Sequence, residues 1–185
     1  VSTDDAEIGT LAKAYGIEVV WRPAEFATDE ATSESALLHA LDFVEQRGFT
    51  ADLVVFLQCT SPVRRDDDID NAIRTLLDEE ADSLFSGTPF HWLIWRRSTD
   101  RLDPLNYDYL DRKRRQEMPE EIHENGSIYV FKPWVLRCFN NRLGGKAAVY
   151  RMAYWSSFQV DSYEDLALCE WIITNRPEAG SPAGF

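Results

Sequence analysis

Apolar and polar residues alternate along this chain in blocks that predict strands and helices in succession. Residues 53–57 are five consecutive apolar residues, and this run ends abruptly in the polar segment 58–61. Five apolar residues without alternation are typical of a strand covered on both faces in a parallel sheet. We therefore predict a central parallel strand at 53–57, with residues 58–61 lining a crevice at its carboxyl end, where open α/β sheets bind ligands. Residue chemistry alone favours a plainer alternative, a strand followed by a Ser-Pro turn.

Apolar residues at helical spacing predict a series of helices. Asp4 followed by Glu7 resembles a capping box and predicts the start of the first helix, which Gly16 ends. Further helices are expected over residues 33–47, after the acidic residues 66–68, over residues 133–139 and after Asp161. The residues expected to face inward are Ile69, Ile73, Leu76 and Leu77 in the third helix, and Leu166, Cys169, Ile172 and Ile173 in the last.

Further strands are predicted over residues 1–3, 17–21, 82–86, 92–97, 127–131 and 147–152, and residues 158–160 lead into Asp161 and the last helix. Strands that alternate with helices and short connections indicate an α/β fold, here a Rossmann-like, mainly parallel sheet flanked by helices. Residues 98–121 have little periodicity, so we expect an inserted arm over approximately 88–126. Because no linker or internal repeat divides the sequence, we expect residues 1–185 to form a single domain.

Charge and cysteine content narrow the classes of function. The chain has 19 basic and 32 acidic residues, a formal net charge of -13, which argues against general binding to nucleic acid or to an anionic membrane surface. No apolar run is long enough to cross a bilayer, the start is not signal-like, and the 3 cysteines lack metal-ligand spacing. We therefore expect a cytoplasmic protein with reduced thiols that binds any anionic substrate through local basic clusters.

Several motifs follow one another in order: VSTDD from Val1, RPAEFATDEATS from Arg22, LQCTSP from Leu57, RRQ from Arg114, ENGSIY from Glu124 and FQVDSYEDL from Phe158. Together they resemble the acylneuraminate cytidylyltransferases, also called CMP-sialic acid synthetases. The resemblance implies a nucleotide-diphospho-sugar transferase-like fold and transfer of CMP from CTP to a sialic acid-like nonulosonate, with release of pyrophosphate and help from Mg²⁺. It also implies that the arm at 88–126 dimerises and completes the sugar pocket, so a homodimer or higher homo-oligomer is expected.

The resemblance further implies roles for individual residues. Positions around the cytidine are matched by Arg22, Ala31 and Ser33, and positions that hold the acidic sugar by Gln58, Arg115, Asn125 and Tyr129. Arginine suits a sugar carboxylate because two parallel N–H donors engage both oxygens. Gln58 and Asp161 are the expected catalytic residues, and Asp161 is the expected Mg²⁺ ligand. Residue chemistry alone leaves plainer roles open: a solvated basic run for Arg115, a core aromatic for Tyr129, a turn for Asn125-Gly126 and a helix cap for Asp161 or Ser162.

Two departures from the family pattern affect the site. The family often presents Asp-x-Asp ahead of its last helix, but this chain has Gln159, Val160 and Asp161 and keeps only the second carboxylate. One carboxylate can serve Mg²⁺ when phosphate and water complete the shell. The family's first strand and glycine-rich phosphate loop are not in this sequence, so we expect an N-terminally incomplete domain with little activity of its own. Arg64 and Arg65 leave the 58–61 segment towards a helix, and we do not expect them to replace that loop.

Two groups of alternatives stay open from the sequence. Within the class, the sugar is another acidic one, such as a legionaminate, a pseudaminate or an octulosonate. Outside the class, the chain is a non-catalytic homologue that binds nucleotide or sugar, or one that only dimerises.

Overall fold

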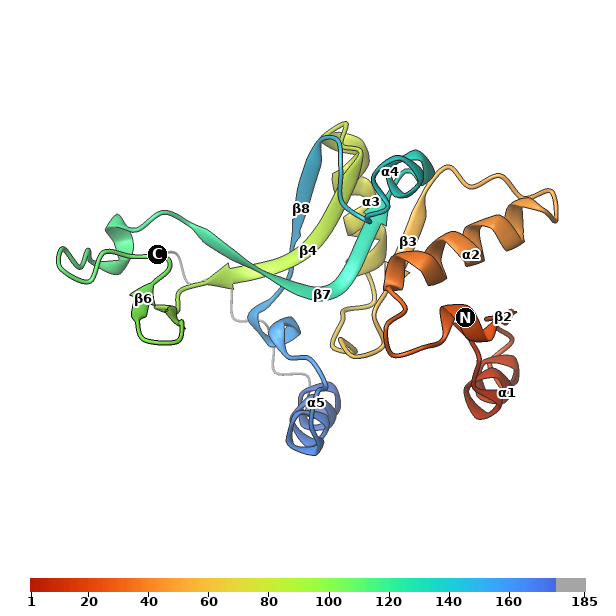
Figure 1. Cartoon of the computed structure of the whole chain (residues 1–185), viewed down its shortest axis with the longest axis horizontal. Helices are drawn as coiled ribbons and strands as arrows, with labels where there is room; N and C mark the ends of the chain where they lie inside the picture. Colours follow the sequence, from red (N-terminus) through yellow and green to blue (C-terminus); the bar gives the residue numbers. More distant parts are fainter. Residues whose placement is uncertain (176–185) are drawn as a thin grey trace. The chain divides into compact units, whose positions relative to one another are not determined.

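The computed structural model of this chain describes residues 1–175 (Figure 1). The chain forms two compact units, each built from discontinuous segments. The first unit contains Val1–Phe56, Ile69–Phe85 and Ile128–Val149, and the second contains Leu57–Asp68, Ser86–Ser127 and the described residues from Tyr150 onward. No helix within residues 1–175 is both long and apolar enough to cross a membrane.

A mixed sheet of four strands has the order β3 (Val54–Leu57), β7 (Glu121–Phe131), β4 (Ser83–Phe90) and β8 (Ala147–Arg151). β7 and β4 are antiparallel, because the Lys132 N–H after β7 donates to the Asp82 carbonyl before β4 at 3.0 Å. β4 and β8 are parallel, because the Asp82 N–H donates to Lys146 and the Met152 N–H donates to Gly87, each at 2.8 Å. The predicted α/β class is confirmed, but the sheet is mixed where a mainly parallel one was expected.

β3 lies at one end of this strand order, and the prediction of a central strand at 53–57 is therefore wrong. Leu57 is 39% exposed, and the three residues before it are only partly buried. An unbroken apolar run shows that side chains on both faces are suited to burial. It carries no information on how many neighbours a strand bonds along its edges. The existence of the strand itself is confirmed.

The first unit also contains a small parallel pair, β1 (Ser2–Thr3) with β2 (Val20–Trp21), next to helix α1 (Ala6–Ala14). Asp5, and not Asp4, caps α1: its Oδ1 accepts from the N–H groups of Glu7 at 2.8 Å and Ile8 at 2.9 Å. The strand predicted at 17–21 is limited to its last two residues.

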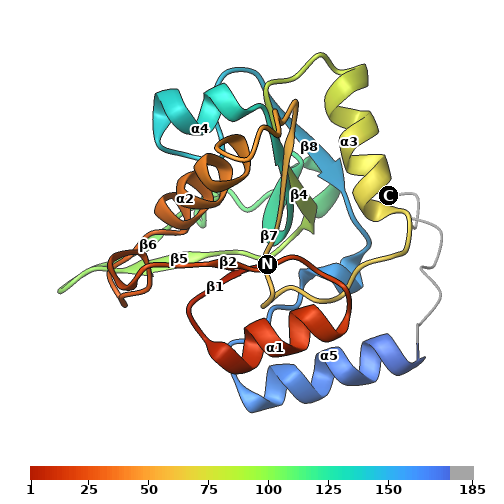
Figure 2. The same ribbon diagram turned by 90° about the vertical axis from the view of Figure 1, so that its right-hand side faces the viewer.

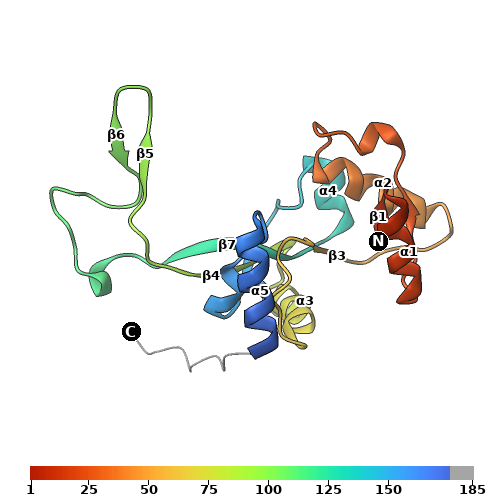
Figure 3. The same ribbon diagram turned by 90° about the horizontal axis from the view of Figure 1, so that it is seen from below.

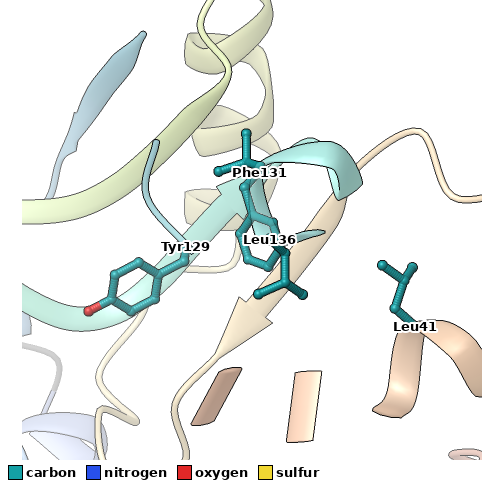
Figure 4. Packing of buried hydrophobic residues seen from close by; sticks show 5 residues of the cluster. Leu41, Tyr129, Phe131 and Leu136 are labelled. Atoms are coloured by element: carbon teal, nitrogen blue, oxygen red, sulfur yellow. The ribbon is translucent and has the colours of Figure 1, made fainter. Parts of the chain in front are cut away.

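The hydrophobic core of the first unit lies where α2 (Ser33–Glu45) and α4 (Pro133–Phe139) meet β7 (Figure 4). The buried cluster consists of Leu41, Tyr129, Phe131, Val135 and Leu136. Figure 2 shows α2 and α4 side by side, which agrees with the contacts between them. Pro133 starts α4 because its missing N–H is not needed in the first turn.

Two further helices are α3 (Asp68–Asp78) and α5 (Tyr163–Asn175), and both were predicted. Leu77, Leu166 and Ile173, which were expected to face inward, are instead 58%, 50% and 45% exposed. In α3 the adjacent Leu76 is fully buried, and neighbouring residues point about 100° apart around a helix, so both do not share one face. In α5 apolar residues occur around most of the circumference, so their spacing does not define a single buried face; Cys169 and Ile172 are buried as predicted.

The arm of the second unit is a hairpin of β5 (Trp95–Arg97) and β6 (Leu102–Pro104), followed by a 3₁₀ turn, η2 (Arg115–Glu117). The hairpin strands are antiparallel, with Trp95 opposite Pro104. Figure 3 shows the hairpin projecting away from α5 and the rest of this unit. The strand predicted at 92–97 is limited to Trp95–Arg97, whereas the one predicted at 127–131 begins earlier, at Glu121.

Candidate functional site

Asn125 on β7 is the centre of a buried hydrogen-bond network in the second unit. Its side chain is fully buried. Asn125 Oδ1 accepts from Ser86 Oγ at 2.6 Å and from the Ser127 N–H at 3.1 Å, while its Nδ2 donates to the Ser156 carbonyl at 3.0 Å. Ser61 Oγ donates to the Asn125 carbonyl at 3.1 Å. Because buried polar groups need partners, Asn125 holds β4, β7 and η3 (Tyr154–Ser157) to the segment 58–61, hereafter the Gln58 loop.

Gly126 brings two amide side chains close to the main chain of β7. Its φ is +68°, in the left-handed region that favours glycine. A Cβ at this position would lie 2.8 Å from Gln58 Oε1, 3.2 Å from Ser61 Oγ and 3.4 Å from Gln159 Nε2. The absence of a side chain therefore creates the space that Gln58 and Gln159 share. Of the predicted sugar-binding residues, the structure brings Gln58 and Asn125 together here.

The segment that carries Gln159 is joined to the Gln58 loop by its main chain. The Val160 N–H donates to the Thr60 carbonyl at 2.7 Å. Asp161 follows directly and is exposed, and among residues 1–175 its carboxylate has no hydrogen-bond or ion-pair partner. The helix-cap role that the sequence left open for Asp161 or Ser162 belongs to Ser162, whose Oγ accepts from the Asp165 N–H at 3.2 Å and donates to Asp165 Oδ2 at 2.7 Å. The Asp161 carboxylate is thus available to a ligand.

The donor chemistry for Mg²⁺ is limited but suitable. In the described part of the chain, His, Cys, Asp and Glu side chains form no group of three or more that would hold a metal ion. Asp161 fits Mg²⁺ as a single exposed carboxylate, because this ion takes one or two protein carboxylates and fills its octahedral shell with phosphate oxygens and water. Its role as a metal ligand stays a prediction.

The residues predicted to contact the nucleotide lie in the first unit. Arg22 Nη2 is 3.5 Å from Asp4 Oδ1, while its Nε is buried and has no hydrogen-bond partner among the described residues. Thr32 caps α2, so Ser33 is its exposed first residue and Ala31 lies just outside the helix. An orphaned guanidinium N–H and a helix start are both groups that bind polar ligands.

Tyr129 and Arg115, predicted to hold the sugar, lie in different settings. Tyr129 belongs to the first unit, is 4% exposed and stacks on Phe56 with ring centroids 5.9 Å apart. The Arg142 guanidinium lies 4.8 Å from the Tyr129 ring centroid, and its Nε donates to Glu34 Oε1 at 2.8 Å. Arg115 is exposed on η2 of the arm and has no ion-pair partner among residues 1–175.

Gly126, the amides of Gln58 and Gln159, and the buried Asn125 form what is hereafter called the Gly126 cluster. Sequence reasoning missed several residues that shape it. Ser86 and Ser156 bind Asn125, but a single serine in or beside a strand carries no pattern that marks it as functional. In the sequence, Gln159 stands out only as a departure from Asp-x-Asp, although its amide lies close to Gly126. Two cavities among the described residues lie elsewhere. A cavity of ≈ 380 Å³ is lined by Phe26, His39 and other residues, and one of ≈ 460 Å³ lies in the arm.

The family described as Cytidylyltransferase matches residues 1–132. This chain belongs to the cytidylyltransferase family. It is 28% identical over 174 residues to an N-acylneuraminate cytidylyltransferase of Oncorhynchus mykiss, covering 92% of this chain and 39% of that protein. It is 27% identical over 186 residues to post-translational flagellin modification protein B of Campylobacter coli, covering 95% of this chain and 77% of that protein. The chain therefore spans well under half of the first relative and about three quarters of the second.

A solved structure supports the fold assignment of this cytidylyltransferase. A CMP:2-keto-3-deoxy-manno-octonic acid synthetase complexed with CTP superposes with a TM-score of 0.66, covering 95% of this chain and 80% of that one. The two sequences are 16% identical, so the likeness concerns the α/β fold alone. It agrees with the α/β fold described above.

Proposed function

We propose that this chain is the CMP-transferring domain of an enzyme that couples CTP to a sialic acid-like nonulosonate and releases pyrophosphate. Membership of the cytidylyltransferase family supports the reaction class, and distant similarity to proteins named N-acylneuraminate cytidylyltransferase supports the sugar class. The observation that carries the proposal is the Gly126 cluster, in which Gln58 and Gln159 face one glycine held in place by the buried Asn125.

In the proposed reaction the anomeric hydroxyl oxygen bonds to the α-phosphorus of CTP while the bond to the leaving pyrophosphate breaks. The Gln58 amide both donates and accepts hydrogen bonds, so it suits the orientation of a sugar hydroxyl. Mg²⁺ bound at Asp161 would neutralise charge on the phosphates. Such transfers depend mainly on positioning and charge neutralisation, which these side chains are suited to supply.

The first unit supplies the proposed nucleotide contacts. Arg22 has a buried Nε without a protein partner among the described residues, and a nucleotide oxygen is a suitable acceptor for it. Ala31 and Ser33 lie at the start of α2, where main-chain N–H groups and a hydroxyl are accessible. A cytosine edge needs both donors and acceptors, and this combination provides them.

The arm supplies the proposed contact to the sugar carboxylate and to a second copy of the chain. Arg115 is exposed and has no ion pair among residues 1–175, so its planar fork is available for a carboxylate. The arm also exposes large apolar side chains, including Trp92, Tyr109 and Leu110, which are 67%, 55% and 81% exposed. Exposed apolar groups gathered in one projecting segment are typical of an interaction surface.

Substrate preference is tested with the complete natural protein. Pyrophosphate release is measured with CTP and a panel of sialic, legionaminic, pseudaminic and octulosonic acids. We expect release that requires both CTP and one of the nine-carbon acids. Preference for the octulosonate would correct the sugar class, whereas binding of CTP or sugar without turnover would identify a non-catalytic homologue and overturn the proposal.

Arg115→Lys tests the sugar contact within this assay. Lysine keeps the charge but loses the bidentate geometry, so the KM for the acidic sugar should rise about 10-fold while the KM for CTP is unchanged. Arg112→Lys is the matched control, because Arg112 is an exposed member of the same basic run. Equal changes in both KM values, or the same change in the control, would remove Arg115 from the sugar site.

A further inference from the structure

Arg64 lies between β3 and α3, three residues beyond the Gln58 loop. The sequence predicts that Arg64 and Arg65 both leave this loop, but the structure separates them. Arg65 is exposed, whereas Arg64 is partly buried and folds back so that its Nη2 donates to the Gln58 carbonyl at 3.4 Å. The Arg64 guanidinium therefore lies against the main chain of a residue in the proposed sugar site.

The charge of Arg64 has no ion-pair partner in residues 1–175. Asp68 is an acidic group whose charge acts on Arg64, but both of its carboxylate oxygens are engaged. Its Oδ1 accepts from Tyr150 Oη at 2.9 Å and its Oδ2 from the Arg65 N–H at 2.6 Å, and the residue is only 4% exposed. Burial lowers the pKa of Arg64, and the negative charge of Asp68 acts in the opposite direction.

A partly buried guanidinium without an ion pair is unusual for a structural residue. Arginine stays protonated in proteins and carries five N–H donors, so removing it from water is costly unless acceptors replace the water. The Gln58 carbonyl is its only protein acceptor within the described residues. The remaining donors of Arg64 thus suit an external anion that arrives at the Gln58 loop.

We propose that Arg64 is an anion-binding residue of the Gln58 loop and meets a carboxylate or phosphate group of the bound substrate. This inference rests on the proposed function, which supplies two anions of the required chemistry: the sugar carboxylate and the phosphates of CTP. The contact with the Gln58 carbonyl orients the guanidinium, while its free N–H groups engage the anion. Arg64 is thereby a second cationic group proposed for the site. It follows strand β3 in the chain, whereas Arg115 belongs to the arm.

The experiment compares Arg64→Met and Arg64→Lys with the wild-type complete protein. Arg74→Met is the matched control, because Arg74 is a surface arginine on α3 that donates to Asn71 Oδ1. Binding of inorganic pyrophosphate and of N-acetylneuraminate is measured by calorimetry, and KM for CTP and for the sugar is measured by pyrophosphate release. Thermal melting of each variant reports on folding.

Loss of one charge-assisted contact should weaken binding of one anion about 10- to 100-fold in Arg64→Met, with partial recovery in Arg64→Lys. A loss confined to pyrophosphate and CTP identifies the phosphate as the anion, and a loss confined to N-acetylneuraminate identifies the carboxylate. Unchanged binding of both anions by a folded variant would overturn the inference, as would a wild-type protein that binds neither. A wild type that binds pyrophosphate through Arg64 but never forms a CMP-sugar would overturn the proposed function alone.

A purely structural role for Arg64 predicts a different result. If Arg64 only held the Gln58 carbonyl and did not touch ligand, Arg64→Met would lower the melting temperature and weaken the binding of both anions equally. Arg64→Lys would then not restore the binding of one anion selectively. This pattern would also overturn the inference.

Discussion

At the residue scale, the candidate site depends on a buried amide and the glycine that follows it. Asn125 uses both ends of its side chain within the protein, so its side chain organises the site, and a direct contact with sugar stays a prediction. Gly126 then leaves room for Gln58 and Gln159. The Asn-Gly pair is more than a turn here, because it joins a buried network to the partly buried amides of Gln58 and Gln159.

Gly126→Ala should impair activity more than stability. A residue other than glycine at this φ costs about 1–2 kcal/mol of unfolding free energy. The closest contact of the new Cβ would be Gln58 Oε1, the end of a flexible side chain, which is able to move away. Movement of Gln58 should raise the KM for the acidic sugar. Urea unfolding and steady-state kinetics measure the two effects.

Gly16→Ala is the control for backbone strain. Gly16 has a similar φ of +73°, but a Cβ there would meet no atom within 4 Å. We expect a comparable loss of unfolding free energy without a change in the sugar KM. Similar kinetic damage in both variants, or full activity of Gly126→Ala, would show that Gly126 does not set the position of Gln58.

At the element scale, the cap of α5 frees Asp161 for other use. Ser162 Oγ accepts from the Asp165 N–H in the first turn, and Asp165 Oδ2 accepts from the Asp161 N–H just before the helix, each at 3.2 Å. The hydrogen bond from the Ser162 hydroxyl is the main reason that the pKa of Asp165 is lowered. Asp161 therefore keeps its carboxylate outside the capping interaction.

The capping role of Asp165 predicts a pH-dependent stability. A carboxyl whose pKa is lowered on folding stabilises the protein above its unfolded pKa, near about 4, and this contribution is lost as the pH falls through the folded pKa. The melting temperature of Asp165→Asn should therefore be below that of wild type at neutral pH. The difference should shrink as the pH falls below about 4.

Glu164→Gln is the matched control, because Glu164 is exposed in the same first turn and makes no hydrogen bond among residues 1–175. Its melting temperature should differ little from wild type across the same pH range. A constant difference between Asp165→Asn and wild type at all pH values would contradict the proposed cap. Thermal melts by circular dichroism at a series of pH values provide the measurement.

At the scale of the whole molecule, the arm provides the strongest indication of association. The arm, approximately residues 88–126, exposes large apolar side chains although the chain as a whole is acidic. Leu110, at 81% exposed, is among the most exposed of them. Burial of such groups against a second copy is favourable by about 25 cal/mol for each Å² of apolar surface removed from water.

If the arm forms the proposed dimer interface, Leu110→Glu should convert the complete protein to a monomer. The added carboxylate would lie in the proposed apolar interface, where burying an unpaired charge is costly. Phe49→Glu is the control, since Phe49 is 62% exposed but lies in the first unit, away from the arm in sequence. Sedimentation equilibrium measures the molecular mass. A wild-type monomer, or a dimer that persists in Leu110→Glu, would remove the arm from the interface.

The sequence by itself determined the α/β class, most helices and the family. These depend on local signals: helical spacing in α2, the proline that starts α4, and motifs in compatible order. Because such signals depend only on residues close together in the chain, they can be recognised in the sequence without a structure.

Only the tertiary structure decided the strand order and the organisation of the candidate site. β3 reads as a central strand but lies at an end of the sheet, because edge pairing depends on distant segments of the chain. The network around Asn125 joins Ser61, Ser86 and Ser156, which are far apart in sequence and carry no local signal. The same is true of Arg64, since its sequence position points away from the loop while its side chain returns to the Gln58 carbonyl. Long-range hydrogen bonds and burial set these features, and no local pattern encodes them.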